Sequence, residues 1–254
     1  MSTKAKYVEG LLYPLFAVAT LIALWSTIVI VFSVPAYLLP TPTQVAKLIV
    51  TDRLYFLSHS LMTAAEALAG LTIAIIAGLF SAAVLASSPR IRIGALPIII
   101  ASQTIPIIAL APIVVLWLGA AFASKVAMAA IMCWFPLVMS ATRGFLEVDP
   151  AIKAVFEVYR ASRFKTFFKL QFPSGLILVM SGLRISAGMA MIGAIVAEYV
   201  GADRGLGYVI TQASYRLDTD RLFAAVICGA IVSVALAQIV YIIGVWLLRG
   251  VLRR

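Results

Sequence analysis

Three ionisable side chains stand inside long apolar runs of the sequence, where charge is costly and a functional role is the default expectation. Glu66 lies well inside one run, with His59 and Thr63 on the preceding helical turns, and Arg184 and Glu198 lie inside a later one. An acid in this setting can line a translocation path or relay protons. It can also pair with a hydroxyl or with Arg184 between helices, and Arg184 can instead extend toward the nearer membrane surface. The sequence leaves these alternatives open.

The chain lacks the patterns typical of an enzyme. His59 is the sole histidine and has no paired acid in its sequence context, and no GxxxxGK[ST] phosphate loop occurs. The glycines of "GADRGLG" lack the strand-turn-helix setting that a dinucleotide site needs. Cys133 and Cys228 each stand inside an apolar run, which favours packing over a disulfide, and no metal-binding spacing is present. We therefore expect no catalytic residue, bound cofactor or metal on this chain.

The composition is that of a protein embedded in a membrane. Hydrophobic residues make up 63% of the 254 residues and charged residues 12%, whereas soluble domains are about half apolar and about a quarter charged. Uninterrupted apolar runs of about 20 residues, long enough to cross a bilayer as helix, recur along the chain. The short alternating strands of a membrane β-barrel are not seen. The predicted fold class is an all-α membrane protein, a helical bundle.

The apolar runs predict a single transmembrane domain, residues 1–254. The first run is too long for a signal peptide, and no small-residue cleavage site follows it, so we expect it to stay in the mature chain. The expected cytoplasmic loop between the fourth and fifth spans covers 146–172. The six predicted spans are 11–33, 57–88, 95–118, 122–142, 174–198 and 222–248.

The basic residues predict the orientation, because cytoplasmic segments carry an excess of lysine and arginine. An orientation with both termini in the cytoplasm leaves the smaller group outside: Lys47, Arg53, Lys125, Arg204, Arg216 and Arg221. The same bias explains the net charge of +10 without a nucleic-acid partner. The larger, cytoplasmic group is Lys4, Lys6, Arg90, Arg92, Arg143, Lys153, Arg160, Arg163, Lys165, Lys169, Arg249, Arg253 and Arg254.

The stretch "AIKAVFEVYRASRFKTFFKLQFP", residues 151–173, predicts two short amphipathic helices outside the bilayer. Asp149 is a suitable N-cap with Pro150 at the first helical position, and Ser162 can cap the second helix. An apolar face follows the helical spacing in each. One interpretation is a helix held at the lipid surface, and the other is a docking element for a cytoplasmic partner. The apolar positions are Ile152, Val155, Phe156 and Tyr159, then Phe164, Phe167 and Phe168.

Two further spans carry patterns that bear on packing and transport. In the fifth, small residues recur at every fourth position and end at Glu198, which predicts close contact with another helix of the bundle or of a second subunit. In the third, Pro106 and Pro112 remove backbone donors and predict a broken helix. Gln103 and Thr104, beside that break, are candidates to line the path. The stripe of small residues is Gly182, Ser186, Ala190 and Ala194.

The chain resembles the permease subunits of ATP-binding-cassette importers, in the group of nitrate, sulfonate, taurine and thiamine-precursor permeases. The similarity covers residues 36–248 and rests on several pieces in the right order. "EALAG" resembles the thiamine-precursor and riboflavin-like branch more than the oxyanion branch. The pieces are "YLLPTPTQVAKLI", "AEALAGLTIAIIAG", "SQTIPIIALAPIVVLWLG" and "FPSGLILVMSGLRISAGMAMIGAIVAEYVGADRGLGYVI".

The resemblance implies a six-helix type I importer fold with a cytoplasmic coupling helix in the segment 149–173. It departs from the family pattern at Arg160, where a glycine is expected, which leaves the turn between the two short helices in doubt. Ala154, Val155 and Phe156 replace a Glu-Ala-Ala triplet, and Ile177 replaces a second proline. The residues expected to couple to the ATPase are Ile152, Val155, Phe156, Glu157, Tyr159, Arg160, Ser162 and Arg163.

The resemblance also implies partners and a mechanism. ATP and Mg²⁺ are expected on a cytoplasmic ATPase dimer, with a second permease copy forming a homodimer and an external binding protein delivering a small solute by alternating access. The expected location is the bacterial inner membrane. Candidates for the path or gate are Glu66, Gln103, Thr104, Arg184 and Glu198, although Glu198 can instead brace the loop from Gly201. A rival hypothesis is a proton-coupled carrier that uses Glu66 and Glu198, and another is a membrane scaffold that transports nothing.

Overall fold

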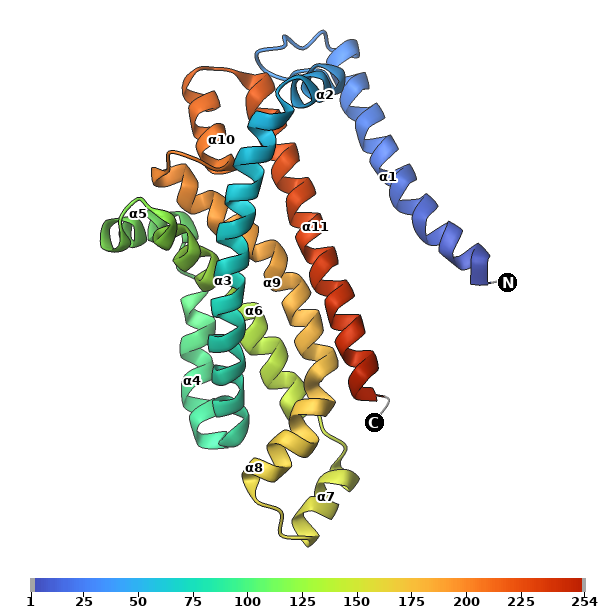
Figure 1. Cartoon of the computed structure of the whole chain (residues 1–254), viewed down its shortest axis with the longest axis vertical. Coiled ribbons are helices and arrows are strands. Elements are labelled where there is room, and N and C mark those ends of the chain that lie inside the picture. The colour runs from blue at the N-terminus through green and yellow to red at the C-terminus, as the bar shows by residue number, and fades with distance from the viewer. Residues whose placement is uncertain (1–2, 253–254) are drawn as a thin grey trace.

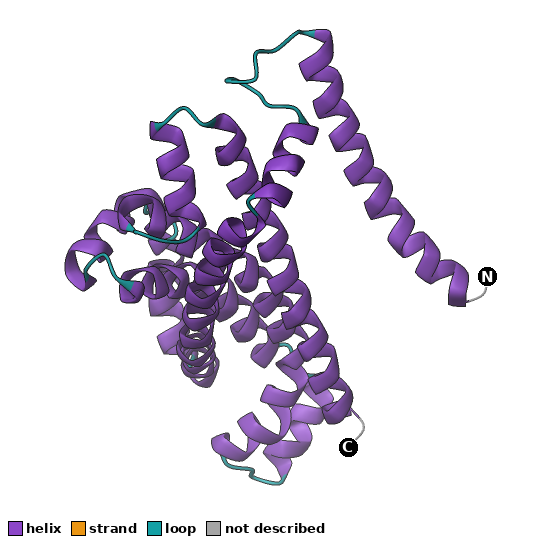
Figure 2. Ribbon diagram, turned by 45° about the horizontal axis from the view of Figure 1, so that its top comes forward, coloured by secondary structure: helices purple, strands orange, loops and turns teal. Residues whose placement is uncertain are grey.

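The structure is a computed structural model that describes the backbone of residues 3–252 and the side chains of residues 12–246. It is a bundle of helices, with no strand in the described part of the chain (Figure 1, Figure 2). Lys4, Lys6, Glu9, Arg249, Arg253 and Arg254 lie outside the described side chains. The helices are α1 (Thr3–Val31), α2 (Pro42–Thr51), α3 (Arg53–Ser87), α4 (Pro89–Ser102), α5 (Ile107–Leu118), α6 (Phe122–Leu146), α7 (Pro150–Val158), α8 (Arg163–Thr166), the π-helical η1 (Phe167–Gln171), α9 (Phe172–Gly201), α10 (Leu206–Tyr215) and α11 (Thr219–Leu252).

Within the described residues, five single helices are long and apolar enough to cross a membrane: parts of α1 and α11, all of α3 and α6, and the run from α8 through α9. The third predicted span, 95–118, is not one helix. Its place is taken by α4 and α5, which meet at an angle of 94° across a short break. Pro106 stands as the N-cap of α5, where the missing N–H costs no helical hydrogen bond, so the helix stops before it and restarts in a new direction.

The core of the bundle is α6, packed between α3 and α9. Small residues let the backbones approach closely: a Cβ added to Gly144 would lie 2.7 Å from the Gly175 carbonyl oxygen, and one added to Gly182 would lie 2.6 Å from the Ser140 Cβ. The predicted stripe on α9 therefore faces α6 of the same chain. Ser186 donates to the Cys133 carbonyl, and Ala190 and Ala194 pack with Ala67 and Ala129. Cys133 and Cys228 are buried among apolar side chains, as the packing interpretation expected.

The outer surface of the bundle is apolar, as a lipid environment requires. Large side chains are exposed along the length of α1, α3 and α11. Helix α1 stands apart from the bundle in both views, and only 6% of the apolar stretch within it is buried inside the protein (Figure 1, Figure 2). The bundle has two distinct ends: α2 and α10 lie at one, and α7 and α8 project from the other (Figure 1).

We predict that Gly193→Ala destabilises the bundle, because the new Cβ would lie 2.7 Å from the Met128 carbonyl oxygen and 2.8 Å from the Ala129 Cα, both backbone atoms of α6. Overpacking of this kind costs about 1–3 kcal/mol. Gly94→Ala in α4 is the matched control, since nothing lies within 4 Å of its added Cβ. Thermal unfolding of the purified full chain in lipid measures both. Equal melting temperatures for the two variants would contradict the close packing of α6 and α9.

Candidate functional site

A buried polar cluster joins three helices near the end of the bundle that carries α10. Thr63 and Glu66 come from α3, Lys125 from the first turn of α6, and Glu198 from the last turn of α9. Their exposed fractions are 0%, 1%, 2% and 1% respectively. Polar groups are costly in such a setting unless each finds a partner. Burying this cluster is therefore energetically costly, which makes it the first candidate for a functional role.

The cluster holds the first turn of α10. The N–H groups at a helix start have no partner inside the helix, and Gly205, the N-cap of α10, has no side chain to supply one. The partners come instead from α3 and α9. Gly205 N–H donates to His59 Nδ1 at 2.9 Å, Leu206 N–H to Thr63 Oγ1 at 2.9 Å, and Gly207 N–H to Glu198 Oε2 at 2.6 Å. The positive end of the α10 dipole thus meets the Glu198 carboxyl group.

The glycines of "GADRGLG" permit this approach. Gly205 has φ +99°, a backbone conformation that residues with a Cβ rarely adopt. A Cβ on Gly207 would lie 2.6 Å from the Glu198 Cβ and 3.0 Å from the Tyr199 nitrogen. The structure therefore places Glu198 in contact with the following loop, which is the bracing arrangement considered from the sequence. Thr63 completes the contact by donating its hydroxyl hydrogen to Glu198 Oε1 at 2.7 Å.

Lys125, which the predicted orientation assigns to the outer group of basic residues, is buried and belongs to the same cluster. Its ammonium donates to the Gly201 carbonyl oxygen at 2.5 Å and to the Ala120 carbonyl oxygen. These contacts satisfy free carbonyls at the C-terminal end of α9 and just before α6. No local pattern predicts this position, because Gly201 is 76 residues from Lys125 in the chain.

Glu66 lies within hydrogen-bonding reach of the Glu198 carboxyl group, and the charge of Lys125 acts on both. Its Oε2 atom is buried and has no hydrogen-bond partner among the described residues. Neither partner predicted for Glu66, a hydroxyl or Arg184, is the one observed. Arg184 is exposed on α9 and lies over the ring of Tyr241, 4.9 Å from its centroid, so the expected pairing with an acid is also replaced, here by a cation-π contact.

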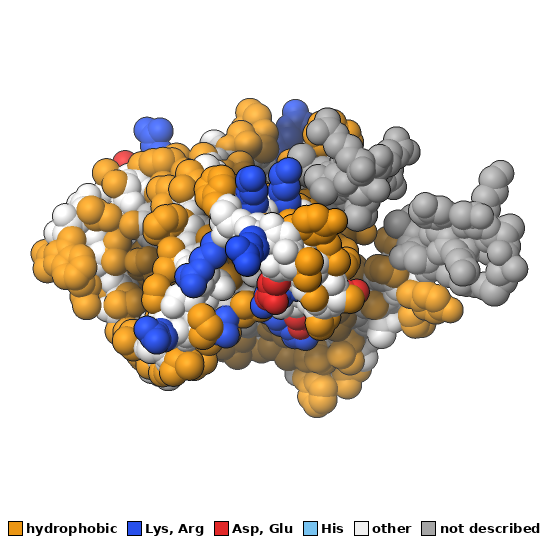
Figure 3. All heavy atoms as spheres, turned by 90° about the horizontal axis from the view of Figure 1, so that it is seen from below, with side chains coloured by type: hydrophobic (Ala, Val, Ile, Leu, Met, Phe, Trp, Pro, Cys, Tyr) orange, Lys and Arg blue, Asp and Glu red, His pale blue; other side chains and the backbone are white. Residues whose placement is uncertain are grey.

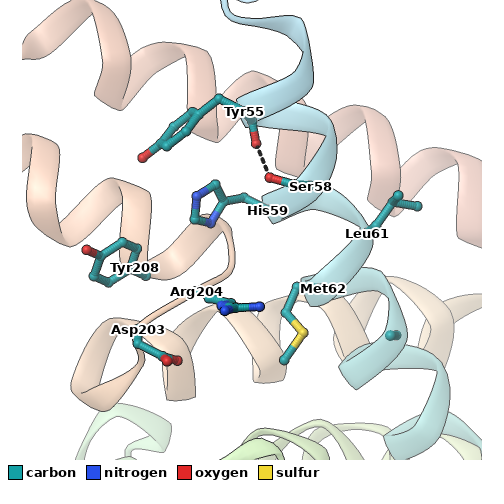
Figure 4. A pocket seen from close by; sticks show the side chains of 9 residues that line it. Tyr55, Ser58, His59, Leu61, Met62, Asp203, Arg204 and Tyr208 are labelled. Carbon is teal, nitrogen blue, oxygen red and sulfur yellow. Dashed lines mark hydrogen bonds between the residues drawn. The ribbon is translucent and has the colours of Figure 1, made fainter.

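Two open cavities of about 630 Å³ and 720 Å³ lie beside the cluster and share Met62, Asp203 and Arg204. In the smaller one, His59 lies between two aromatic rings, 4.5 Å from the Tyr55 centroid and 6.0 Å from that of Tyr208 (Figure 4). Arg204 and Asp203 add one charge of each sign from the α9–α10 segment. Rings and charges in this arrangement suit a small polar molecule with a flat face.

The other path candidates lie elsewhere. Gln103 and Thr104 are exposed at the break between α4 and α5, and Thr104 donates its hydroxyl hydrogen to the Ala101 carbonyl at 2.8 Å. Neither lines the two cavities beside the buried cluster. The structure therefore brings Glu66 and Glu198 together but not with Gln103, Thr104 or Arg184.

The predicted coupling segment, residues 149–173, forms a helical hairpin at the opposite end of the bundle (Figure 1). Asp149 accepts from the Ala151 N–H at 2.8 Å and Ser162 from the Lys165 N–H at 3.3 Å, which are the two caps predicted from the sequence. The second helix is not separate. It continues from α8 through η1 into α9, passing Pro173, whose missing N–H falls in the first turn of α9.

The turn between these helices forms despite the absent glycine. Arg160 adopts φ +49°, the left-handed conformation that usually selects glycine. The Ala161 N–H donates to the Phe156 carbonyl and the Arg160 N–H to the Glu157 carbonyl, both at 2.9 Å, the pattern of a Schellman motif. The doubt about this turn is thereby resolved, and the cost is local backbone strain of about 1 kcal/mol.

The hairpin presents an exposed face that is both apolar and basic. Ile152, Val155 and Tyr159 are 48%, 51% and 81% exposed, whereas Phe156, the fourth member of the predicted face, is half-buried. Glu157, Arg160, Ser162 and Arg163 are exposed around it. Viewed from this end of the molecule, basic side chains gather on the surface (Figure 3). Large exposed apolar groups on a segment outside the spans are typical of a site that binds a partner.

The fold and these two sites define an integral membrane protein with an exposed apolar and basic helical hairpin at one end. Residues 70–253 match the family model of binding-protein-dependent transport system inner membrane components. A probable ABC transporter permease protein of Haemophilus influenzae is 34% identical over 226 residues, which are 89% of this chain and 92% of that protein. The formylaminopyrimidine transport permease protein ThiX of Halalkalibacterium halodurans is 35% identical over 191 residues, 75% of this chain and 76% of that one. The putative aliphatic sulfonates transport permease protein SsuC of Bacillus subtilis is 30% identical over 233 residues, 89% and 81% of the two chains.

The chain belongs to this family of ABC transporter permeases, and its architecture is the all-α type I permease fold. The family relation confirms the resemblance inferred from the sequence motifs. It identifies the chain as a transport component rather than an enzyme.

We predict that Thr63→Val frees the first turn of α10, because valine keeps the shape of the side chain but removes the acceptor of the Leu206 N–H and the donor to Glu198. An unpaired buried group of this kind costs about 1–3 kcal/mol. Hydrogen exchange followed by mass spectrometry should show faster exchange across residues 203–211. Thr63→Ser, which keeps the hydroxyl, is the control, and equal protection in both variants would mean that the hydroxyl does not hold α10.

We also predict that Arg160→Gly stabilises the hairpin by about 1 kcal/mol relative to Arg160→Ala, because only glycine relieves the left-handed strain while both remove the charge. Exchange of the α7 amides should accordingly be slower in the glycine variant. An alanine variant as well protected as the glycine variant would show that the turn is not strained at this residue.

Proposed function

We propose that this chain is the membrane-spanning permease subunit of an ATP-driven, binding-protein-dependent importer of a small solute. Two copies form the translocation path, an ATPase dimer binds on the cytoplasmic side, and a substrate-binding protein docks on the outside. The family supports the ATPase and binding protein as the kinds of partner. Neither a phosphate loop nor any other nucleotide motif stands in the sequence, so ATP and Mg²⁺ belong to the partner.

The observation that carries the proposal is the exposed face of α7. A helix of nine residues projects beyond the spans and leaves Ile152, Val155 and Tyr159 largely open to solvent. An isolated helix of this length is marginal in water, so its persistence depends on what it packs against. A groove on a partner would bury this apolar face in the helix-in-groove mode. The surrounding basic residues, Lys153, Arg160 and Arg163, suit a groove with an acidic rim.

The direct connection from the hairpin into the bundle supports coupling. The helix that begins at Arg163 continues to Gly201 over 39 residues, a rise of about 58 Å at 1.5 Å per residue. When ATP closes the ATPase dimer and draws the two α7 helices together, this helix moves with them. The cavity between the two permease copies then changes the side to which it opens. With both termini in the cytoplasm, α7 and α8 also lie in the cytoplasm, while α10 lies at the outer surface of the inner membrane.

The substrate we propose is a small heterocycle of the thiamine-precursor type. The support is the relation to a formylaminopyrimidine permease together with the aromatic rings beside the outer cavity, Tyr55, His59 and Tyr208. A second candidate class is the small oxyanions, such as a sulfonate, taurine or nitrate. The relation to a sulfonate permease and the arginine at position 204, in the wall of both cavities, favour that class.

We predict that Tyr159→Asp uncouples transport from ATP hydrolysis, because it places a carboxylate on an 81% exposed aromatic position at the C-terminal end of the apolar face of α7. Loss of about 1.4 kcal/mol or more of binding lowers the affinity for the ATPase about tenfold. Uptake into vesicles that contain the whole assembled transporter measures the effect, and Tyr159→Phe, which keeps the ring, is the control. Undiminished uptake by the aspartate variant, at an equal amount of chain in the membrane, would contradict the assigned role of α7.

A further inference from the structure

The buried cluster contains more negative than positive ionisable groups. Glu66 and Glu198 are each 1% exposed and adjacent, and Lys125 is the one cation buried with them in the described part of the chain. The remaining ionisable groups nearby lie toward the cavities: Asp203 and Arg204 add one charge of each sign, and His59 accepts the Gly205 N–H. Two ionised carboxylates would therefore leave uncompensated charge in an apolar interior.

The state in which both carboxyl groups are ionised is unfavourable. Two like charges in contact in a medium of low dielectric repel strongly, and adjacent carboxyl groups in protein interiors relieve the repulsion by holding one proton between them. Lys125 cannot compensate both acids. Its ammonium already donates to the carbonyl oxygens of Ala120 and Gly201. Protonating one carboxyl group balances the cluster and supplies the donor that the pair lacks.

The hydrogen bonds indicate which carboxyl group is ionised. Both oxygens of Glu198 have donors, Thr63 Oγ1–H at Oε1 and Gly207 N–H at Oε2, and donors of this kind favour the carboxylate. Glu66 has the opposite surroundings. Its Oε2 has no partner among the described residues, and its carboxyl group is within hydrogen-bonding reach of Glu198. A neutral Glu66 can donate its O–H to Glu198, which an ionised Glu66 cannot do.

We propose that Glu66 and Glu198 share one buried proton, resident on Glu66, and that this acid-carboxylate pair fixes the first turn of α10 against α3 and α9. Glu66 is a positioning residue. It keeps Glu198 in place and ionised without drawing on a second buried cation, and Glu198 holds the Gly207 N–H. This assignment rests on the geometry of the chain itself and does not depend on the identity of the solute or of the ATPase.

Infrared spectroscopy tests the proton directly. The full chain, held at neutral pH in a detergent without ester groups, should give the carbonyl stretching band of a neutral carboxylic acid. The band should be lost in Glu66→Gln and unchanged in Glu147→Gln, which alters an exposed acid paired with Arg143. Absence of the band from the wild-type chain, or its persistence in Glu66→Gln, would overturn the proposal. Absence of the band from the wild-type chain overturns the proposal even where a variant fails to fold.

Hydrogen exchange tests the positioning role with the same chain. Glu66→Gln should leave exchange at residues 205–207 unchanged, because the amide N–H₂ donates to Glu198 as the neutral acid does. Glu198→Gln should speed it about tenfold or more, since the single amide oxygen cannot replace two carboxylate acceptors and the lost charge-assisted bond contributes about 1.5–3 kcal/mol. Faster exchange in Glu66→Gln to the same degree would show that Glu66 acts as a carboxylate and would overturn the assignment.

Discussion

The arrangement at the end of the molecule that carries α10 depends on one interaction, the capping of α10 by side chains from α3 and α9. His59, Thr63 and Glu198 accept the N–H groups at residues 205–207, which have no partner within their own helix. Asp203 and Arg204, which line both cavities, lie on the short segment just before this cap. The position of the cavity wall is therefore set by the cap. The proposed proton on Glu66 explains how two buried acids can coexist there.

The same constraint connects the two ends of the molecule. Glu198 lies in the last turn of the helix that begins at Arg163 in the coupling hairpin, and small residues hold this helix against α6 along the way. A close-packed interface of this kind transmits movement rather than absorbing it. In the proposed mechanism, a displacement of α7 by the ATPase reaches the α10 cap through α9. The left-handed Arg160 sits at the turn where that displacement enters the chain.

Local features of the structure could be predicted from the sequence, and long-range ones could not. The caps at Asp149 and Ser162, the stripe on α9 and the break near Pro106 each follow from residues a few positions apart. The 94° bend does not, because proline shows where a helix stops but not the direction of the next one. The pairing of Glu66 with Glu198 and the burial of Lys125 arise only when three distant helices come together. The family glycine expected at Arg160 marks the left-handed position of the turn, and the hydrogen bonds of the turn sustain an arginine there.

The central claim is that this chain moves solute only together with an ATPase. The most direct test is to purify the tagged full chain gently from its native membrane and identify the proteins that accompany it. Solute flux is then measured in proteoliposomes that contain either the chain with these proteins or the chain alone. Our account predicts an ATPase subunit in comparable amount, uptake that requires ATP, and no flux by the chain alone. A chain that purifies alone and carries solute at the expense of a proton gradient would contradict it, and would return Glu66 and Glu198 to the role of proton relay.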